Sequence, residues 1–230
     1  MAPKLDHIVI LLPVSATPEQ LLRHAEPFKK NFRLSPGGFH TDKQTQNVLI
    51  SLPDGVYVEL IAFTSKSHNS DHPWAQRHPT NIIDFALLGR PEQGKEAYQE
   101  GRPGGRGESK WVVTMPKHQW GVGTLPFWCG DVTPRELRVP KSETHPSGVT
   151  AVKKITVLVD SQKQLERVTK MFQEVVGGEE LKVGTRSGGE ITIDVRTPAT
   201  KEEEQALASN GEGINEIEFD AGVVICNNLL

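Results

Sequence analysis

The order strand, helix, strand, strand, strand is expected at both ends of this chain, and the repeat restricts the fold more than any other feature. Residues 5–12 are predicted to form a strand that is apolar on both faces. A helix follows at Pro18, because proline is favoured in the first helical turn. Further strands are expected near Phe39, over 47–52 and over 56–63, the last two joined by Asp54-Gly55, a hairpin signal.

The final third of the chain repeats this order. A strand over 153–159 precedes a helix from Ser161, a good N-cap, to Val176. Gly177-Gly178 ends that helix, and strands follow at Leu181, 191–195 and 214–219. A single β-α-β-β-β unit makes a curved sheet that cannot close its own core, so two or more units must pack together.

The middle of the chain is interpreted as a degenerate third unit. Strands are expected over 81–89, 111–115 and 125–131, with a long loop rich in glycine and charge over 90–107. The predicted division is 1–65, 66–148 and 149–230. The fold class is α+β: repeated β-α-β-β-β modules forming curved, mostly antiparallel sheets with helices on the outer faces and a ligand in the concavity.

Composition excludes several classes of partner. The net charge is −3 and lysine and arginine are scattered, so a nucleic-acid footprint is missing. No apolar run approaches ~18 residues and no leader pattern opens the chain, which argues against membrane insertion and secretion. Cys129 and Cys226 are far apart in sequence and neither has a C-x-x-C partner, so neither a disulfide framework nor a thiolate zinc site can be argued, and a cytoplasmic location is favoured. Phosphate-cradling motifs are absent, so no nucleotide cofactor is expected. The oligomeric state is open, with a homodimer as one arrangement.

Several motifs together resemble the glyoxalase-like family of the vicinal-oxygen-chelate superfamily. The most specific are Leu5-Asp6-His7-Ile8-Val9, the Pro36-Gly37-Gly38 turn, Thr45-Gln46-Asn47 and Tyr57-Val58-Glu59-Leu60-Ile61-Ala62. Later matches are Trp74, Asp84-Phe85-Ala86-Leu87, Trp111, Leu125-Pro126-Phe127 and His145-Pro146-Ser147-Gly148. In that superfamily the first and fourth strands of a module supply metal ligands. The resemblance therefore implies a divalent metal, of unknown identity, bound by His7 and Glu59.

Strand alternation supports a pocket at these two residues. Alternation predicts that Leu5, His7, Val9 and Leu11 share one face, and that Tyr57, Glu59, Ile61 and Phe63 share another. A carboxylate among apolar neighbours needs a cation or a hydrogen-bond donor. The alternative is structural: His7 is a core histidine and Glu59 is its ion-pair partner.

The other modules offer no obvious second pair of ligands. The repeat places Lys154 and Ile217 of the last module near the positions of His7 and Glu59, while the middle unit offers Phe85 and Trp128. A metal would therefore be held by an incomplete set and would bind weakly, with several waters.

Further residues are candidates for substrate binding. Thr45 and Asn47 share a face, with Gln46 pointing away, and can either reach a ligand or complete the strand. Arg106, with Arg102, either clamps an anionic substrate or belongs to a solvated loop. His145 either contacts substrate or is structural. An aromatic wall, or else ordinary core packing, is expected from Trp74, Trp111, Phe127 and Trp128.

The loop around Trp74 contains further candidate residues. Trp74 is a candidate lid residue over the pocket. His68, His72 and His78 accompany Asp71 in this loop, but their irregular spacing disfavours a metal cluster.

Two functions from different classes follow. The first is an enzyme acting on a small oxygenated substrate, with His7 and Glu59 as catalytic residues that act through a metal or as an acid/base pair. The resemblance implies isomerase, lyase, dioxygenase or ring-opening chemistry. The second is a non-catalytic protein that binds or sequesters a small molecule, as resistance proteins do.

Overall fold

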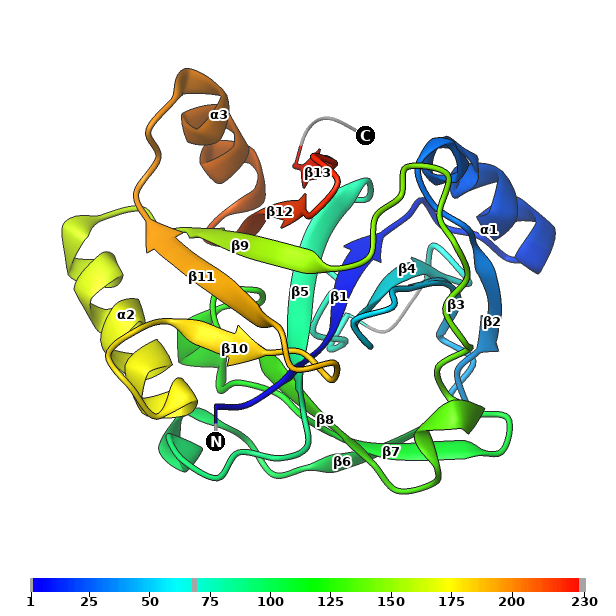
Figure 1. Ribbon diagram of the computed structural model, residues 1–230, viewed down its shortest axis with the longest axis horizontal. Coiled ribbons are helices and arrows are strands. Elements are labelled where there is room, and N and C mark those ends of the chain that lie inside the picture. The colour runs from blue at the N-terminus through cyan, green and yellow to red at the C-terminus, as the bar shows by residue number, and fades with distance from the viewer. Residues whose placement is uncertain (1, 68–69, 228–230) are drawn as a thin grey trace.

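The computed structural model describes residues 2–67 and 70–227, which form one eight-stranded and one five-stranded sheet (Figure 1). Within these residues, no helix is both long enough and apolar enough to span a membrane. The elements, with 3₁₀ helices marked η, run in the order β1 (Leu5–Leu11), α1 (Pro18–His24), η1 (Glu26–Lys30), β2 (Ser35–Phe39), β3 (Thr45–Ser51), β4 (Tyr57–Phe63), β5 (Asn81–Leu88), η2 (Lys95–Ala97), β6 (Arg102–Arg106), β7 (Ser109–Thr114), η3 (His118–Trp120), β8 (Phe127–Asp131), η4 (Arg135–Leu137), β9 (Val152–Leu158), α2 (Gln162–Val176), β10 (Lys182–Gly184), β11 (Glu190–Arg196), α3 (Lys201–Asn210), β12 (Gly213–Phe219) and β13 (Val224–Cys226).

The eight-stranded sheet consists of two similar halves. Its order is β2-β3-β4-β1-β5-β8-β7-β6, with β1 and β5 antiparallel at the centre. Each central strand pairs in parallel with the last strand of its own half, β1 with β4 and β5 with β8. The other pairings in this sheet are antiparallel. The predicted α+β class with curved, mostly antiparallel sheets is confirmed.

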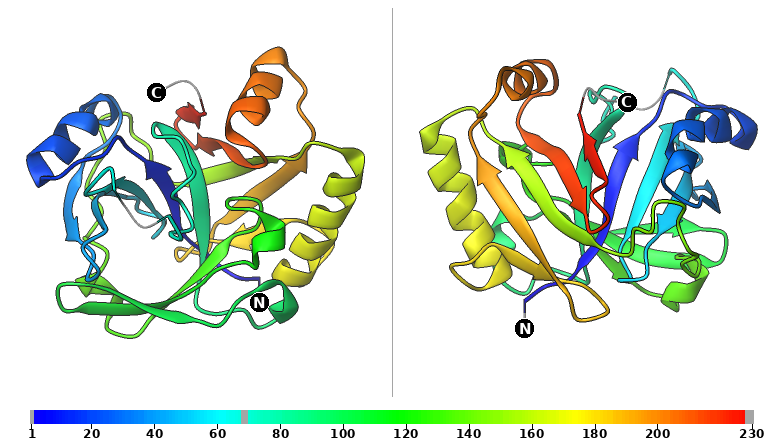
Figure 2. Two further views of the ribbon diagram at one scale, coloured as in Figure 1. Left: turned by 180° about the vertical axis from the view of Figure 1, so that it is seen from behind. Right: turned by 45° about the horizontal axis from the view of Figure 1, so that its top comes forward.

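The two faces of this sheet carry separate apolar clusters. Ile8 and Ile10 of β1 face an outer core that also contains residues of α1, of α2 and of the five-stranded sheet. Val9 and Leu11 face an inner cluster. The Phe85 and Phe172 rings stack at 6.3 Å and join β5 to α2, while β12 lies beside β5 in the left-hand view of Figure 2. The helices thus cover the outer face, as expected.

A β-bulge in β1 changes which side chains face inward. Leu5 pairs with Leu87 and His7 pairs with Ala86, so Asp6 is an extra residue in the ladder. The expected alternation is therefore wrong at Leu5, which packs in the outer core, although His7 does face inward. Asp6 and His7 can both lie on the inner side although they are adjacent in sequence.

A second bulge, at Ile83 in β5, corrects the predicted counterparts of the site residues. Val9 pairs with Asp84 and Ile10 with Ile82, which leaves Ile83 extra. Asp84 therefore occupies in the second half the place that His7 has in the first. The expectation of Phe85 was wrong, because its ring faces the outer core.

The register of β8 corrects the counterpart of Glu59 in the same way. Val9 pairs with Glu59, and its equivalent Ala86 pairs with Phe127. Phe127 is therefore the counterpart of Glu59. Trp128, which sequence reasoning had placed there and in the aromatic wall, lies in the outer core.

The C-terminal unit departs from the repeat. β9 pairs in parallel with β11 and antiparallel with β12. Glu59 lies on β4, which is parallel to β1, so its counterpart must lie on β11, which is parallel to β9. Ile217 lies on β12, which is antiparallel to β9 as β5 is to β1, so Ile217 is not the counterpart of Glu59. Lys154 on β9 forms an ion pair with Glu218. Helix α3, which was not expected from the sequence, separates β11 from β12.

Two segments expected as turn or loop are strands. Pro36-Gly37-Gly38 lies within β2, where the register shifts between Pro36 and Gly38. A Cβ atom at Gly37 would lie 2.1 Å from Asn47 Oδ1, so only glycine fits there. Part of the expected 90–107 loop is the edge strand β6. The unit boundaries after residues 65 and 148 stay predictions.

Phe172 belongs to one apolar core that contains residues of both sheets. Because the two sheets share this core, we expect the protein to unfold in a single cooperative transition. We expect Phe172→Ala to lower the free energy of unfolding by about 3–5 kcal/mol, because it removes a buried aromatic ring and leaves a cavity. Urea unfolding followed by far-ultraviolet circular dichroism measures this loss. Val224→Ala, at a side chain that is 49% exposed, is the control and should change stability little. Two separate transitions in the wild type would contradict a shared core.

Candidate functional site

A cavity of about 690 Å³ lies on the inner face of the eight-stranded sheet. One end is polar, with side chains from β1, β3 and β4 and from the turn after β2. The opposite wall is apolar and aromatic, formed by β7, β8 and the segment that contains Trp74. A pocket of this size and mixed lining is typical of a small-molecule site.

His7 and Glu59 meet in this cavity. His7 Nε2 lies 3.6 Å from Glu59 Oε2, and both side chains are buried. The ring of His7 stacks on Tyr57 with a centroid separation of 4.6 Å and meets Phe127 edge-on at 5.2 Å. These ring contacts hold the imidazole in one plane.

Asp6, at the bulge, fixes the other nitrogen of His7. The Asp6 carboxylate lies 2.7 Å from His7 Nδ1 and accepts hydrogen bonds from Arg135 and Arg138, the latter at 2.9 Å. Burial alone would raise the pKa of Asp6, but Arg138, His7 and Arg135 outweigh it and hold the pKa far below its usual range. The carboxylate can only accept, so His7 Nδ1 donates to it, and in the neutral imidazole Nε2 faces Glu59 with a free lone pair.

Asn47 fixes the orientation of Glu59. Its side-chain nitrogen donates to Glu59 Oε1 at 2.5 Å, and its oxygen accepts from Arg106 Nη1 at 2.8 Å and from the Gly38 N–H at 3.2 Å. The two donors determine which end of the amide is oxygen, so its nitrogen must face Glu59. Thr45 and Asn47 therefore both face the cavity, as alternation predicted, while the Gln46 side chain turns away to donate to the Ser15 carbonyl.

His40 is a site residue that sequence reasoning missed. Its Nε2 lies 3.5 Å from Glu59 Oε1 and 3.3 Å from Asn47 Nδ2, and its Nδ1 lies 2.6 Å from Thr45 Oγ1. Burial lowers the pKa of His40, and nearby Arg106 lowers it further against the opposing effect of Glu59. His40 follows the end of β2, and the register between β2 and β3 brings it close to Glu59. Because this register is not a local property of the sequence, no motif around His40 predicts its place in the site.

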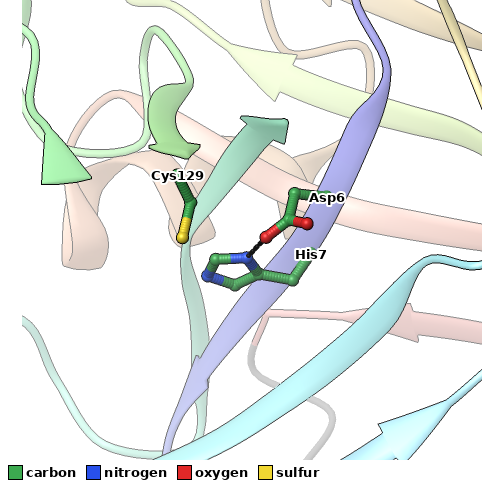
Figure 3. A group of neighbouring side chains, drawn as sticks. All are labelled: Asp6, His7 and Cys129. Carbon is green, nitrogen blue, oxygen red and sulfur yellow. Dashed lines mark hydrogen bonds and ion pairs between the residues drawn. The ribbon is translucent and has the colours of Figure 1, made fainter. Parts of the chain in front are cut away.

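Ligand atoms of Asp6, His7 and Cys129 lie within 4.8 Å of one another (Figure 3). This group fits a metal poorly. The Asp6 oxygens are occupied by two arginines and by His7, and burial raises the pKa of the Cys129 thiol well above its usual value. A protonated thiol is a weak ligand. Asp6 acts here as the partner that orients His7.

His7 Nε2 and Glu59 fit a divalent ion better, because imidazole nitrogen and carboxylate oxygen are both ordinary ligands and open onto the cavity. At the equivalent positions, the second half of the sheet offers no further metal ligand. Asp84 accepts hydrogen bonds from Trp74 Nε1 at 2.9 Å and from its neighbour Phe85 N–H at 3.0 Å, and Phe127 is apolar.

The structure gathers most of the predicted substrate-binding residues around this one cavity: Thr45, Asn47, Trp74, Trp111, Phe127 and Arg106, with Arg102 also in the lining. Trp74 is buried in the wall and tied to Asp84. The Arg106 guanidinium donates to two neutral acceptors, Asn47 Oδ1 and the Arg138 carbonyl.

His145 is not among the residues that line this cavity. Its Nδ1 accepts from the Arg33 N–H at 3.0 Å and its Nε2 lies 3.1 Å from the Ser51 carbonyl, so both nitrogens bond to the backbone. Burial lowers its pKa. His72 lies in the cavity wall, with its ring 5.3 Å from that of Trp74. His68 lies outside the described residues.

The fold and the cavity define a protein of the vicinal-oxygen-chelate superfamily. The chain belongs to the glyoxalase-like domain family, whose model matches residues 5–176. A comparison with curated proteins found no match.

Two solved structures have a similar fold. A hypothetical protein from Staphylococcus aureus is 14% identical, with a TM-score of 0.57 over 85% of this chain and 87% of that one. A mutant of 4-hydroxymandelate synthase from Streptomyces coelicolor is 12% identical, with a TM-score of 0.53 over 95% of this chain and 71% of the other. Both likenesses show the fold alone.

The raised pKa of Asp84 leads us to expect that the free energy of unfolding depends on pH. Burial raises its pKa from 3.8 to about 7, although Trp74 and the Phe85 N–H act against this. Between these pH values the folded chain binds more protons than the unfolded chain, so the Asp84 contribution to stability falls as pH rises. We expect the stability of Asp84→Asn relative to wild type to increase from pH 4 to pH 7, because asparagine stays neutral. Urea unfolding at several pH values tests this, and a constant difference between the two proteins would refute it.

Proposed function

We propose that this protein is an enzyme that acts on a small oxygenated molecule, with His7 and Glu59 as its catalytic residues. The observation that carries the proposal is the ordered sequence of contacts from Asp6 through His7 Nδ1 and Nε2 to Glu59, ending in a cavity. A purely structural ion pair would not require a cavity beside it. Reactions within this scope are isomerisation, elimination, dioxygenation and ring opening.

In this proposal the two residues divide the proton chemistry. His7 Nε2, which carries the lone pair in the neutral imidazole, accepts a proton, and the protonated nitrogen then donates a hydrogen bond to an oxygen of the substrate. Asn47 donates to one oxygen of Glu59, and the second oxygen is available as a base. Tyr57 and Phe127 pack on the imidazole and exclude water from one side.

The cavity also suggests the kind of substrate. Trp74, Trp111 and Phe127 offer an apolar wall to a flat or hydrocarbon part. Arg106 has neutral partners and can pair with a carboxylate or phosphate group. We infer a substrate with an apolar body and an anionic, oxygen-bearing end.

A divalent metal, if the protein uses one, would be held by His7 and Glu59. Bound there, the ion would supply a Lewis acid that polarises an oxygen of the substrate. With few protein ligands it should exchange readily and be removed by a chelator.

The alternative is a protein that binds a small molecule without transforming it. Phe127 and Asp84 favour this reading, because one offers no ligand atom and the other is hydrogen-bonded to Trp74 and to the backbone. For either function we propose a cytoplasmic location, as the two free cysteines suggest, and we leave a homodimer open.

Glu59→Gln separates a functional role from a structural one. The change keeps the shape and removes the charge. If Glu59 works in the cavity, we expect at least ~10-fold weaker binding of a divalent ion or substrate analogue, with a small change in stability. Differential scanning calorimetry and isothermal titration calorimetry measure the two effects.

Glu202→Gln, at an exposed helical site, is the matched control for loss of a carboxylate and should change neither quantity. A structural buried pair would behave differently. It would lose about 3–5 kcal/mol of stability when broken and leave binding unchanged. That pattern would refute the proposed function.

A further inference from the structure

We propose that the Tyr57 hydroxyl is a further substrate-binding group of the site and donates a hydrogen bond to a substrate oxygen beside His7. The inference deepens the proposed function and rests on it. Its basis is that Tyr57 lines the cavity and that no described residue accepts its hydroxyl proton.

The contacts of Tyr57 leave its proton unused. The side chain is buried in the cavity wall, and its oxygen accepts a hydrogen bond from Arg138 Nη1 at 2.7 Å. A guanidinium has no lone pair, so Arg138 cannot accept the proton in return. No other group within residues 2–67 and 70–227 accepts it either. A buried donor without an acceptor is costly, so the acceptor must come from what fills the cavity.

The other tyrosine of the chain has a satisfied hydroxyl. Tyr98 packs in the outer core, where its ring meets Trp128 edge-on at 6.3 Å. Its hydroxyl donates to the Pro126 carbonyl at 3.0 Å. The sequence contains two tyrosines, and the one whose hydroxyl lacks an acceptor is the one that lines the cavity. The unused proton is therefore a property of the site.

Arg138 makes the Tyr57 hydroxyl a stronger donor. The same Arg138 nitrogen also donates to Asp6 at 2.9 Å, which keeps the guanidinium in place. A hydrogen bond accepted from a charged group polarises a hydroxyl and strengthens the bond that the hydroxyl donates. Burial raises the pKa of Tyr57 well above its usual value, so the phenol keeps the proton that it donates.

Tyr57 lies beside both proposed catalytic residues. Its ring stacks on His7 with a centroid separation of 4.6 Å, and Glu59 follows two residues later on the same face of β4. A substrate oxygen bound to the Tyr57 hydroxyl would therefore lie at the same wall as the base. Negative charge that develops on this oxygen when the base takes a proton would be stabilised by the donor.

4-Nitrophenolate is a suitable probe, because it combines a flat ring with one charged oxygen. Its visible band moves to shorter wavelength as that oxygen accepts stronger hydrogen bonds. 4-Nitroanisole has the same ring and an uncharged, methylated oxygen, so it measures the contribution of the apolar wall. Both compounds are titrated into the full chain, above the pKa of free 4-nitrophenol, and followed by absorption and isothermal titration calorimetry.

Three variants separate the contributions. Tyr57→Phe removes the hydroxyl and keeps the ring that stacks on His7. Tyr98→Phe is the matched control, because it removes a buried hydroxyl outside the cavity. Arg106→Gln removes the other group that could bind a charged oxygen. Circular dichroism establishes that each variant is folded.

We expect Tyr57→Phe to lose at least ~10-fold in affinity for 4-nitrophenolate, because a hydrogen bond to a charged oxygen is lost. The band of the bound probe should move to longer wavelength. Binding of 4-nitroanisole should be unchanged, and Tyr98→Phe should match the wild type for both compounds.

Wild-type affinity for 4-nitrophenolate in folded Tyr57→Phe would overturn the role of Tyr57 and leave the proposed function standing. Loss in Arg106→Gln with none in Tyr57→Phe would overturn it and assign the charged oxygen to Arg106. Equal losses of both compounds in Tyr57→Phe would reduce the hydroxyl to a packing role. Absence of 4-nitrophenolate binding by the wild type would also overturn the inference, and the Glu59→Gln measurement with a divalent ion would then decide the proposed function.

Discussion

The buried carboxylate of Asp6 is the group on which the site depends. The Asp6 carboxylate is fully buried, and its charge is balanced by Arg135 and Arg138. Both arginines lie in the segment that follows β8, the strand that pairs with β5 in the second half of the sheet. Arg138 also donates to Tyr57 and pairs with Asp131. An uncompensated charge at this depth would cost several kcal/mol, so the two arginines must be in place for β1 to hold His7 as it does. The network thereby ties the first half of the sheet to the second.

One extra residue in each central strand sets the composition of the cavity wall. Ordinary alternation would put Asp6 and His7 on opposite faces, and the bulge allows both to face inward. The second bulge does the same for Ile83 and Asp84. The strands themselves could be predicted from apolar runs and turn signals, which are local properties. The bulges could not, because an extra residue is defined only against the partner strand.

The same distinction explains which site residues were predictable. His7, Glu59, Thr45 and Asn47 lie on strands whose inward face follows from local alternation and from recognisable motifs. His40 follows a strand end, and its approach to Glu59 depends on the register between β2 and β3. Arg135 and Arg138 carry no local signal, because buried arginines resemble solvated ones in sequence and their partner Asp6 is more than a hundred residues away.

The two halves of the sheet place chemically different groups at equivalent positions. His7 and Glu59 of one half correspond to Asp84 and Phe127 of the other. Burial raises the pKa of Asp84 to about 7, and its carboxyl accepts the hydrogen bond from Trp74, so this half of the sheet presents a mainly apolar wall to the cavity. An apolar wall facing His7 lowers the local dielectric constant and strengthens every charge interaction at Glu59. The loss of ligands from the second half therefore does more than subtract donors: it gives the remaining polar groups a drier environment, in which a bound cation or a proton held between His7 and Glu59 interacts more strongly with them.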